Sequence, residues 1–239
     1  MNRITDRISF FRSPPHDCGY FLDRRAETIF AHPESYPDRS SQTVLAKHGF
    51  RRSGKFLYRP ACLGCSACIP VRIPVSDFRL SRSQKRVLAR NHDLKQAQVQ
   101  LLPTEERLEL YQRYQSERHP DGQMLATSNQ NLLDFFDSPW SDTRFTEFRL
   151  DEQLICVSIS DRLDDAWSAV YTFFDPRFAK RSLGTLAILN LLSLARSESL
   201  DWVYLGYWIA DSPKMNYKNR FRPMEKFVDG NWLSLESVG

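Results

Sequence analysis

The stretch AWSAVYTFFDPRFAKRSLGTLAILNLLSLARSESLDWVYLGY (residues 166–207) contains a strand, a long helix and a second strand in direct succession. Its hydrophobic pattern predicts strands over Ala166–Phe174 and Asp201–Tyr207, with a helix over Ser182–Ser199 between them. A strand–helix–strand order makes a crossover connection, which places two strands parallel in one sheet. The sequence therefore predicts the α/β class (α+β) with at least one parallel strand pair.

Shorter elements flank this unit on both sides. Strands are predicted at Arg144–Leu150 and Gln153–Ser160, so the sheet is expected to be mixed. The other predicted elements are a helix at Thr43–Phe50 ending at Gly49, a hairpin turn at Ser53-Gly54, a strand at Val71–Val75 that Pro74 confines to a sheet edge, a basic helix at 81–94 capped by Ser81 or Ser83, a helix from Thr104 to about Arg118, and a short helix at 131–139.

The composition indicates a folded globular protein. The 239 residues (28.0 kDa) are 41% hydrophobic and have a mean hydropathy of −0.48, which excludes a disordered chain. The longest apolar stretch, Leu186–Ala195, is about half of the roughly 20 residues that a membrane span needs. The first 18 residues contain no apolar signal segment. We therefore expect a cytoplasmic protein with reduced cysteines and no membrane partner.

Positive charge is concentrated in the first half of the chain. Residues 47–95 carry 12 basic and 2 acidic side chains, and such a field attracts polyanions. Aromatic side chains are interleaved with these cations, as on a nucleic-acid surface. The alternative is a solvated face whose charges pair elsewhere. The residues proposed for nucleic-acid contact are Arg51, Arg52, Lys55, Arg82, Lys85, Arg86 and Arg90.

The loop DPRFAKRSLGT (Asp175–Thr185) joins the third strand to the long helix. The first amides of a helix and the positive end of its dipole favour an anion. The residues expected to hold a phosphate there are Arg177, Lys180, Arg181, Ser182 as a cap and Gly184 for close approach. Basic residues kept only for solubility are the alternative. A GxGxxG or Walker A motif is absent from the sequence, which argues against a dinucleotide or P-loop nucleotide.

The segment Tyr204–Phe227 alternates aromatic and basic residues. Aromatic walls could hold an acyl or aminoacyl group while the cations contact an acceptor. A carboxy-terminal arm that covers the sheet with snorkelling lysines is the alternative.

Three cysteines at two successive C-x₂-C spacings, Cys62, Cys65 and Cys68, follow the basic hairpin, and Cys18 is a fourth thiol upstream. Such a cluster could bind zinc or an iron–sulfur cluster. The alternative is that these cysteines pack as small apolar side chains in a loop.

Four separated blocks resemble one family. They are GFRRSGKFLYRPACLGCSACIPVRI (49–73), SRSQKRVLARN (81–91), VYTFFDPRFAKRSLGT (170–185) and YLGYWIADSPKMNYKNRFRP (204–223). Together they resemble the arginyl-tRNA–protein transferase family, in particular its short bacterial branch, which transfers leucine. The upstream CGYC motif of longer members reads CGYF here, with Phe21 in place of the second cysteine. This departure weakens the metal binding that the resemblance would imply for Cys18.

This resemblance implies an amino-terminal, cysteine-containing domain at 1–100 and a GNAT-like aminoacyl-transfer domain at 101–239. It also implies that aminoacyl-tRNA donates leucine, rather than arginine, to proteins with N-terminal Asp or Glu, which marks them for N-degron proteolysis. The basic residues above would then contact tRNA. No cofactor would be required, although zinc or an iron–sulfur cluster could be bound.

The implied reaction is attack of an amine on an ester, which needs alignment and oxyanion stabilisation more than a dedicated base. Candidates for a helping side chain are Asp175, Tyr207 and Tyr217. Candidates for holding the acceptor's acidic side chain are Lys214, Lys218, Arg220 and also Arg51. Two other functions stay open on residue evidence alone: an acyl-CoA-dependent N-acetyltransferase and a non-catalytic RNA-binding module.

Overall fold

The computed structural model describes residues 8–35, 38–99, 104–118, 128–136 and 138–235. Its helices are α1 (Arg39–Lys47), α2 (Arg82–Arg90), α3 (Glu105–Arg118), α4 (Asn129–Phe136) and α5 (Leu183–Ser197), with short 3₁₀ turns η2 (Pro33–Ser35), η3 (Pro176–Arg181) and η4 (Asn216–Arg220). Its strands are β1 (Phe10–Arg12), β2 (His16–Asp17), β3 (Arg25–Ala26), β4 (Thr28–Ala31), β5 (Arg51–Ser53), β6 (Phe56–Pro60), β7 (Ile69–Pro74), β8 (Leu94–Val99), β9 (Asp142–Leu150), β10 (Gln153–Arg162), β11 (Ala166–Phe174), β12 (Trp202–Trp208), β13 (Glu225–Val228) and β14 (Asn231–Ser234).

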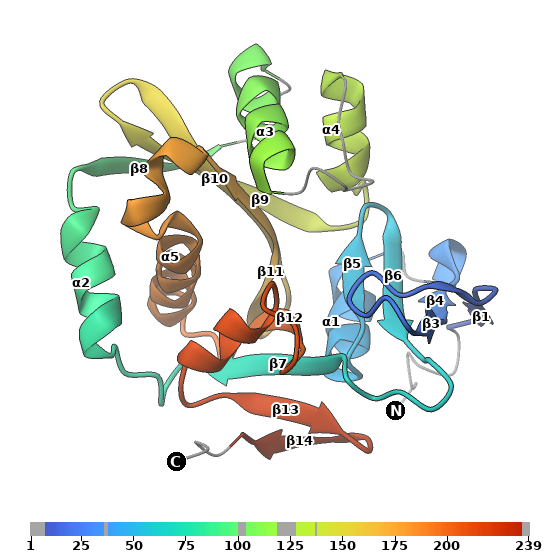
Figure 1. Ribbon diagram of the computed structural model, residues 1–239. Helices are drawn as coiled ribbons and strands as arrows, with labels where there is room; N and C mark the ends of the chain where they lie inside the picture. Colours follow the sequence, from blue (N-terminus) through green and yellow to red (C-terminus); the bar gives the residue numbers. More distant parts are fainter. Residues whose placement is uncertain (1–7, 36–37, 100–103, 119–127, 137, 236–239) are drawn as a thin grey trace.

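Two main sheets lie beside each other (Figure 1). The large sheet has the strand order β14-β13-β7-β12-β11-β10-β9-β8, and the small sheet has the order β1-β4-β6-β5. Only β11 and β12 pair parallel in the large sheet, and its other described neighbours are antiparallel. The predicted mixed α/β architecture is therefore confirmed. In the described segments, no helix is long and apolar enough to span a membrane.

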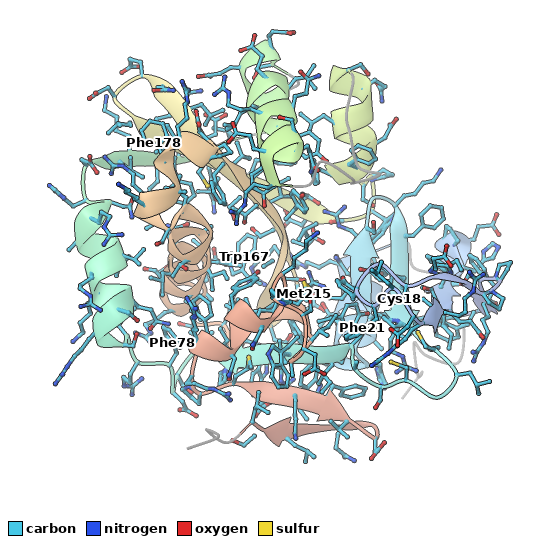
Figure 2. The ribbon with its side chains drawn as sticks, viewed as in Figure 1. Cys18, Phe21, Phe78, Trp167, Phe178 and Met215 are labelled. Atoms are coloured by element: carbon cyan, nitrogen blue, oxygen red, sulfur yellow. The ribbon has the colours of Figure 1, made fainter. Side chains whose placement is uncertain are left out.

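The predicted crossover unit is confirmed, with α5 connecting β11 to β12. The apolar side of α5 packs on one face of the sheet, where Trp167, Leu192 and Val203 share a buried cluster. Helices α3 and α4 cover the other face, where Tyr111 and Phe136 pack against strand residues. Figure 2 shows Trp167 at the centre of the molecule. The long apolar run of α5 is thus explained by burial inside a covered sheet.

The β11–β12 pair separates soon after it begins. Their parallel register covers only Ala166 opposite Trp202 to Ser168 opposite Tyr204, although β11 continues to Phe174 and β12 to Trp208. The register of β12 against β7 also shifts between Tyr204 and Gly206. We call the place where residues 169–174 and 205–208 no longer pair the β11–β12 split. A bulge of this kind bends a strand away from its neighbour.

The strand expected at a sheet edge lies inside the sheet, so that prediction is wrong. Strand β7 lies between β12 and β13. Its prolines are tolerated because β13 pairs only with Val71 and Arg72, between Pro70 and Pro74. Neither proline is therefore required to donate a hydrogen bond to β13.

Sheet membership does not follow the predicted division of the chain at residue 100. Strands β7 and β8 precede that residue, yet both belong to the large sheet. The chain leaves the small sheet after β6 and enters the large one at Ile69. Long-range pairing, which local charge does not report, decides where each strand lies.

Most other predicted elements are confirmed with shifted ends. Helix α2 begins after Ser81, which forms a capping box with Gln84, and β5 and β6 form the predicted hairpin with Gly54 at φ +53°. Helix α1 begins earlier than predicted, after the cap Asp38. Ser182 does not cap α5 with its side chain, because its backbone is left-handed at φ 58°, ψ 47°.

Candidate active site

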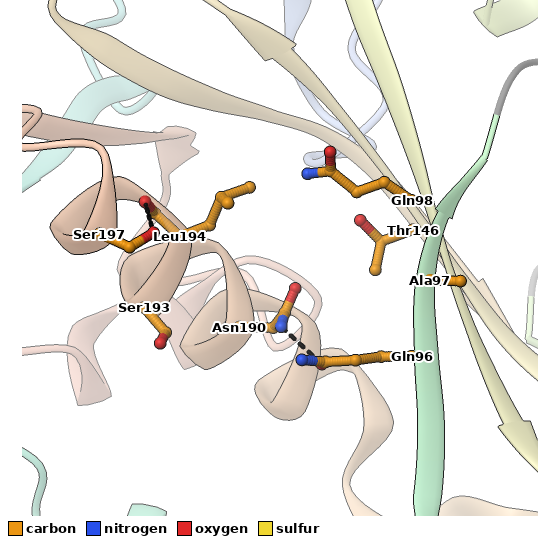
Figure 3. Close-up of a pocket in the computed structure, with 8 residues that line it drawn as sticks. All are labelled: Gln96, Ala97, Gln98, Thr146, Asn190, Ser193, Leu194 and Ser197. Carbon is orange, nitrogen blue, oxygen red and sulfur yellow. Dashed lines mark hydrogen bonds between the residues drawn. The ribbon is translucent and has the colours of Figure 1, made fainter.

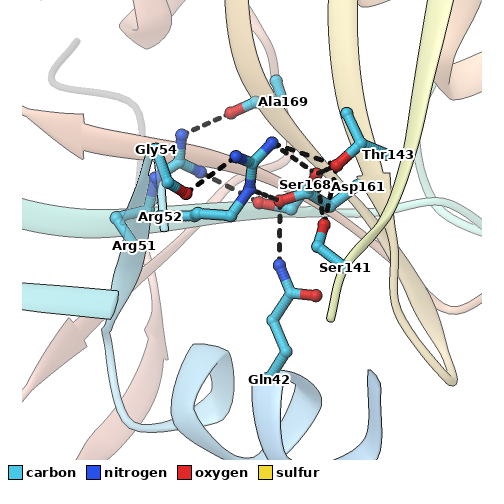
Figure 4. Close-up of polar contacts among 9 residues, drawn as sticks. All are labelled: Gln42, Arg51, Arg52, Gly54, Ser141, Thr143, Asp161, Ser168 and Ala169. Carbon is cyan, nitrogen blue, oxygen red and sulfur yellow. Dashed lines mark hydrogen bonds and ion pairs between the residues drawn. The ribbon is translucent and has the colours of Figure 1, made fainter. Parts of the chain in front are cut away.

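Arg51 reaches from the small sheet into the β11–β12 split. Its guanidinium donates a hydrogen bond to Ser168 Oγ at 3.2 Å and another to the backbone oxygen of Ala169 (Figure 4). These acceptors lie just where β11 stops pairing with β12. None of the ion pairs within the described segments supplies Arg51 with a carboxylate. A half-buried guanidinium without an acidic partner is a ready site for a carboxylate or phosphate.

Gly206 makes room for that guanidinium. A Cβ at this position would lie 2.9 Å from Arg51 Cζ and 3.0 Å from Arg51 Nε. The backbone of Gly206 is also left-handed at φ +81°, a conformation that glycine adopts without a steric cost. The bulge, the glycine and the diverging strands together create the space that Arg51 fills.

Replacing Gly206 with alanine is expected to destabilise the protein more than replacing Gly230. Both glycines have φ +81°, but a Cβ at Gly230 would meet no atom within 4 Å. Backbone strain is therefore matched. The Arg51 guanidinium must shift to admit the methyl group, and the hydrogen bonds that it then loses to Ser168 and Ala169 should add about 1 kcal/mol to the loss of unfolding free energy at Gly206. Urea unfolding of both variants measures the difference. Equal losses would show that Arg51 moves aside freely.

Lys218 is a second cation beside the split. It is 5% exposed, and its Nζ donates to the backbone oxygen of Tyr207 at 2.7 Å. Met215 Sδ lies 3.5 Å from the same nitrogen, and the Tyr217 ring centroid lies 5.2 Å away. Burial, together with the charge of Arg51, lowers the pKa of Lys218 to about 7. Near neutral pH, a large share of this amine is therefore uncharged and able to accept a proton.

Of the three candidates for a helping side chain, only Tyr217 keeps an accessible ring. It is 41% exposed and stands over Lys218. Tyr207 is buried, its hydroxyl lies within hydrogen-bond distance of the backbone oxygens of Gly49 and Tyr58, and burial raises its pKa well above its usual value. We therefore assign Tyr207 a structural role that connects the two sheets.

Asp175 is not available as a base, contrary to the sequence-based prediction. It is 0% exposed, and Arg113 Nη1 lies 2.7 Å and Arg177 Nη2 2.6 Å from its Oδ2. Burial alone would raise the pKa of Asp175, but hydrogen bonds from Arg177 and the charge of Arg113 hold it below its usual value. The carboxylate caps η3 and fixes these arginines.

The predicted anion loop is largely occupied by internal contacts. Arg181 forms a two-point ion pair with Asp93 at 2.8 and 2.9 Å, and Arg177 is held by Asp175. Lys180 remains exposed. A Cβ built at Gly184 would lie 3.8 Å from Phe174 Cε1, an ordinary van der Waals distance, so the packing of the protein itself does not require a glycine there.

Basic side chains on α2 form an exposed surface, which we call the α2 face. Arg82, Lys85 and Arg86 are all exposed on it. Arg90 donates to the backbone oxygen of Lys180 and thereby fixes α2 to η3. Gln84 donates to the backbone oxygen of Arg220 at 3.1 Å and fixes the other end of the helix. The α2 face therefore lies between the anion loop and the segment after β12.

The structure removes Arg52 from the predicted nucleic-acid set. Its side chain is 1% exposed and forms an ion pair with Asp161, with Nε 2.6 Å from Oδ2 (Figure 4). A polyanion cannot reach it. Lys55 stays near the exposed edge of the small sheet, with its Nζ 5.7 Å from the Phe56 ring centroid. Among the predicted acceptor contacts, Lys214 and Arg220 are exposed and Lys218 is buried beside the split.

The cysteines of the amino-terminal region are free thiols. Burial, with Cys18, Cys62 and Cys65 nearby, raises the pKa of the Cys68 thiol to about 12. Figure 2 places Cys18 and Phe21 in the loops over the small sheet. Across the segments that the structure describes, no three His, Cys, Asp or Glu side chains come close enough together to hold a metal ion. As arranged here, the thiols do not fit a zinc or iron–sulfur site.

A separate pocket of about 280 Å³ lies between α5 and the edge of the sheet at β8 and β9 (Figure 3). Its lining side chains are uncharged, and Asn190 Nδ2 donates to Gln96 Oε1 at 2.6 Å across it. It contains no cation and no base, so we do not assign the reaction to it.

Sequence reasoning assigned no role to Gly206, Ser168 or Arg113, which shape the site. A glycine inside a predicted strand is a signal for a bulge or a close contact, and that signal alone could have identified Gly206. The partners of Arg51 and Asp175 lie too far away in sequence to be found without a fold.

Comparison with known proteins supports this assignment. Family models described as "Arginine-tRNA-protein transferase, N terminus" and "Arginine-tRNA-protein transferase, C terminus" match residues 16–86 and 106–228. Aspartate/glutamate leucyltransferases are similar over nearly full length: 43% identity over 230 residues for Saccharophagus degradans (96% of this chain, 98% of the relative) and 45% over 232 residues for Nitrosococcus oceani (97% and 98%). The Pseudomonas fluorescens relative is 45% identical over 231 residues (96% and 97%).

Solved structures align more loosely. L-PGS from Bacillus licheniformis superposes with a TM-score of 0.48 and 10% identity, over 86% of this chain and 70% of that one. FemX superposes with a TM-score of 0.45 and 7% identity, over 88% and 82%.

The mixed α/β fold, the cationic site and the sequence relatives together define an aminoacyltransferase. The amino-terminal and carboxy-terminal models of one family match this chain in that order, and together they cover most of its residues. The chain belongs to the arginine-tRNA–protein transferase family.

Proposed function

We propose that the protein transfers leucine from aminoacyl-tRNA to the α-amino group of proteins that begin with Asp or Glu, and so marks them for N-degron proteolysis in the cytoplasm. The observation that carries the proposal is the convergence of Arg51 and Lys218 at the β11–β12 split, where neither has a carboxylate partner among the described residues. Family membership and the leucyltransferase relatives support it.

The reaction joins an amine to an activated ester. The α-amine nitrogen attacks the ester carbonyl carbon, a C–N bond forms, and the C–O bond to the tRNA ribose breaks. An α-amino group has a pKa near 8, so only about a tenth of it is neutral at pH 7. The uncharged amine of Lys218 accepts the proton that the nucleophile loses and returns it to the departing ribose oxygen. No cofactor enters this scheme.

Arg51 is placed to hold the acceptor. Its guanidinium can bind the side-chain carboxylate of an N-terminal Asp or Glu while the adjacent α-amine faces Lys218. Charge-assisted bonds of this kind discriminate against a neutral first residue, because such a residue would leave the half-buried cation without a partner.

Leucine suits the site better than arginine as the transferred group. An arginine side chain would require an uncompensated carboxylate near the split, whereas Asp175, the buried carboxylate at the end of β11, is already neutralised by Arg113 and Arg177. Tyr217 and the thioether of Met215 lie beside Lys218. Figure 2 labels Met215 near the centre of the molecule. These groups present apolar surface to a leucyl side chain.

The direct test of function offers leucyl-tRNA or arginyl-tRNA to the protein with peptides that begin with Asp, Glu, Lys or Ala. Mass spectrometry should show leucine added to the Asp and Glu peptides only. Inhibition by sub-millimolar acetyl-CoA with acetylated product would instead favour an N-acetyltransferase, and binding of tRNA without transfer would favour an RNA-binding module.

The α2 face should supply part of the tRNA affinity. Replacing Arg82, Lys85 and Arg86 together by alanine is expected to lower the affinity for tRNA. The slope of the logarithm of the association constant against the logarithm of the salt concentration should become shallower by about 2–3, because each lost phosphate contact removes about one unit. Filter binding between 50 and 200 mM salt measures this slope. Lys95→Ala is the control, because Lys95 is exposed but pairs with Glu152 at 3.3 Å. A triple variant with an unchanged slope would remove α2 from the interface.

A further inference from the structure

Aromatic side chains form a continuous row across the small sheet. Phe11 on β1 lies opposite Phe30 on β4, Phe30 lies opposite Tyr58 on β6, and Tyr58 lies opposite Arg51 on β5. Directly opposed residues project from the same face of a sheet. One face of this sheet thus carries three aromatic rings in a line that ends at the guanidinium in the β11–β12 split.

The rings are in contact along the row. Phe11 and Phe30 are stacked, with centroids 5.3 Å apart and planes at 18°. Phe30 and Tyr58 are 6.3 Å apart, and Tyr58 meets Tyr207 of the large sheet at 5.9 Å. We call Phe11, Phe30 and Tyr58 the aromatic row.

This face is not needed for the core. Ala31, Leu45 and Leu57 form the buried cluster on the opposite face of the sheet. Phe11 is 44% exposed, and Phe56, whose ring touches Phe30 edge-on at 6.0 Å, is 36% exposed. Phe30 and Tyr58 are half-buried, so the exposed part of this face is formed by Phe11 and Phe56 on either side of Phe30. Large aromatic side chains left exposed together on a sheet indicate a binding surface.

We propose that the aromatic row is a stacking platform for the unpaired 3′ nucleotides of the aminoacyl-tRNA, which leads the ester toward Arg51 and Lys218. The inference rests on the proposed function and names the part of the donor that this surface recognises. Bases stack on aromatic side chains whatever their sequence, and sheets that present two or three such rings bind two or three bases.

Continuity and charge favour a nucleic acid here over an apolar peptide. From Phe11 to Arg51 the distance is three strand spacings, about 14 Å, so the aromatic row ends beside Arg51 rather than at an isolated surface. Lys55 lies beside Phe56, with Nζ 5.7 Å from its ring centroid, which places positive charge along the row where a phosphate backbone would run.

The test compares two neighbouring phenylalanines. Phe11→Leu removes the first ring of the row. Phe10→Leu is the matched control, because Phe10 is 50% exposed on the same strand but projects from the opposite face and packs on Phe50 at 5.4 Å. The probe is a leucylated acceptor-stem minihelix with its single-stranded 3′ end, beside a blunt duplex that lacks this end.

Phe11→Leu should weaken binding of the minihelix about tenfold, as expected for one lost base stack, and leave binding of the blunt duplex unchanged. Phe11→Trp should restore minihelix binding. At saturating minihelix the rate of leucyl transfer by Phe11→Leu should equal that of the wild type, so that KM changes and kcat does not.

Three results would overturn the inference: equal minihelix affinity for Phe11→Leu and the wild type, an equal loss in Phe10→Leu, or a KM change for the acceptor peptide instead of the minihelix. The last result would identify the row as a peptide site. Failure of the wild type itself to transfer leucine would refute the proposed function, and the minihelix affinities would still decide whether the row binds the unpaired end.

Discussion

Lys218→Met is expected to reduce leucyl transfer at pH 7 by at least about 100-fold, the usual contribution of a proton acceptor. Methionine keeps the apolar bulk of the buried stem but cannot accept a proton. Lys218→Arg should be equally inactive, because a guanidinium stays protonated. If Lys218 only supplied positive charge, arginine would restore activity, so the pair of variants separates the two roles.

The pH dependence gives an independent check on Lys218. Burial lowers the pKa of its amine to about 7, so wild-type kcat should rise with pH below that value and level off above it. The free energy of unfolding should also rise from about pH 7 toward pH 10, because the unfolded lysine stays protonated there while the folded one does not. In Lys218→Met, the rise of kcat around pH 7 should disappear, and the free energy of unfolding should rise less between pH 7 and pH 10 than in the wild type. Unchanged profiles in that variant would contradict the role assigned to Lys218.

Asp161→Asn is expected to lower the free energy of unfolding by about 3–5 kcal/mol. Both partners of the Arg52–Asp161 pair are 1% exposed. The Asp161 carboxylate also accepts from Gln42 Nε2 at 2.8 Å and Thr143 Oγ1 at 2.8 Å (Figure 4). The amide of asparagine is similar in size but leaves the Arg52 charge uncompensated in the interior. Urea unfolding measures the loss.

Glu27→Gln is the control for this experiment. Glu27 pairs with Arg12 at 2.8 Å, but the Arg12 side chain is 52% exposed, so breaking this pair should cost no more than about 1 kcal/mol. If Asp161→Asn lost as little as Glu27→Gln, the buried pair would contribute nothing specific to the junction of the two sheets.

Local pattern was sufficient for the crossover unit. The apolar periodicity over α5 specifies a helix, and the alternation in β10 specifies a strand. A strand–helix–strand order nearly always forms a right-handed crossover between parallel strands. Helix α2 was predictable for the same reason, since Ser81 and Gln84 form its cap within four residues of sequence.

The site was less predictable because its residues depend on distant partners. Arg51 and Arg52 are adjacent and chemically identical, yet strand alternation sends one guanidinium into the split and the other to Asp161, 109 residues away. Asp175 similarly looked like a free carboxylate until α3 supplied Arg113. Charge content identifies how many cations are present, but only the fold shows which of them are already paired.

The contacts of Arg51 limit how the two halves of this chain can be exchanged between related proteins during evolution. A side chain from the small sheet satisfies the carbonyl oxygen of Ala169, which β12 leaves open in the large sheet. A recombinant that received the second half from a distant relative would have to receive a compatible β5 and Gly206 as well. Exchanges of sequence between relatives should therefore keep β5 and the segment around Gly206 from the same parent.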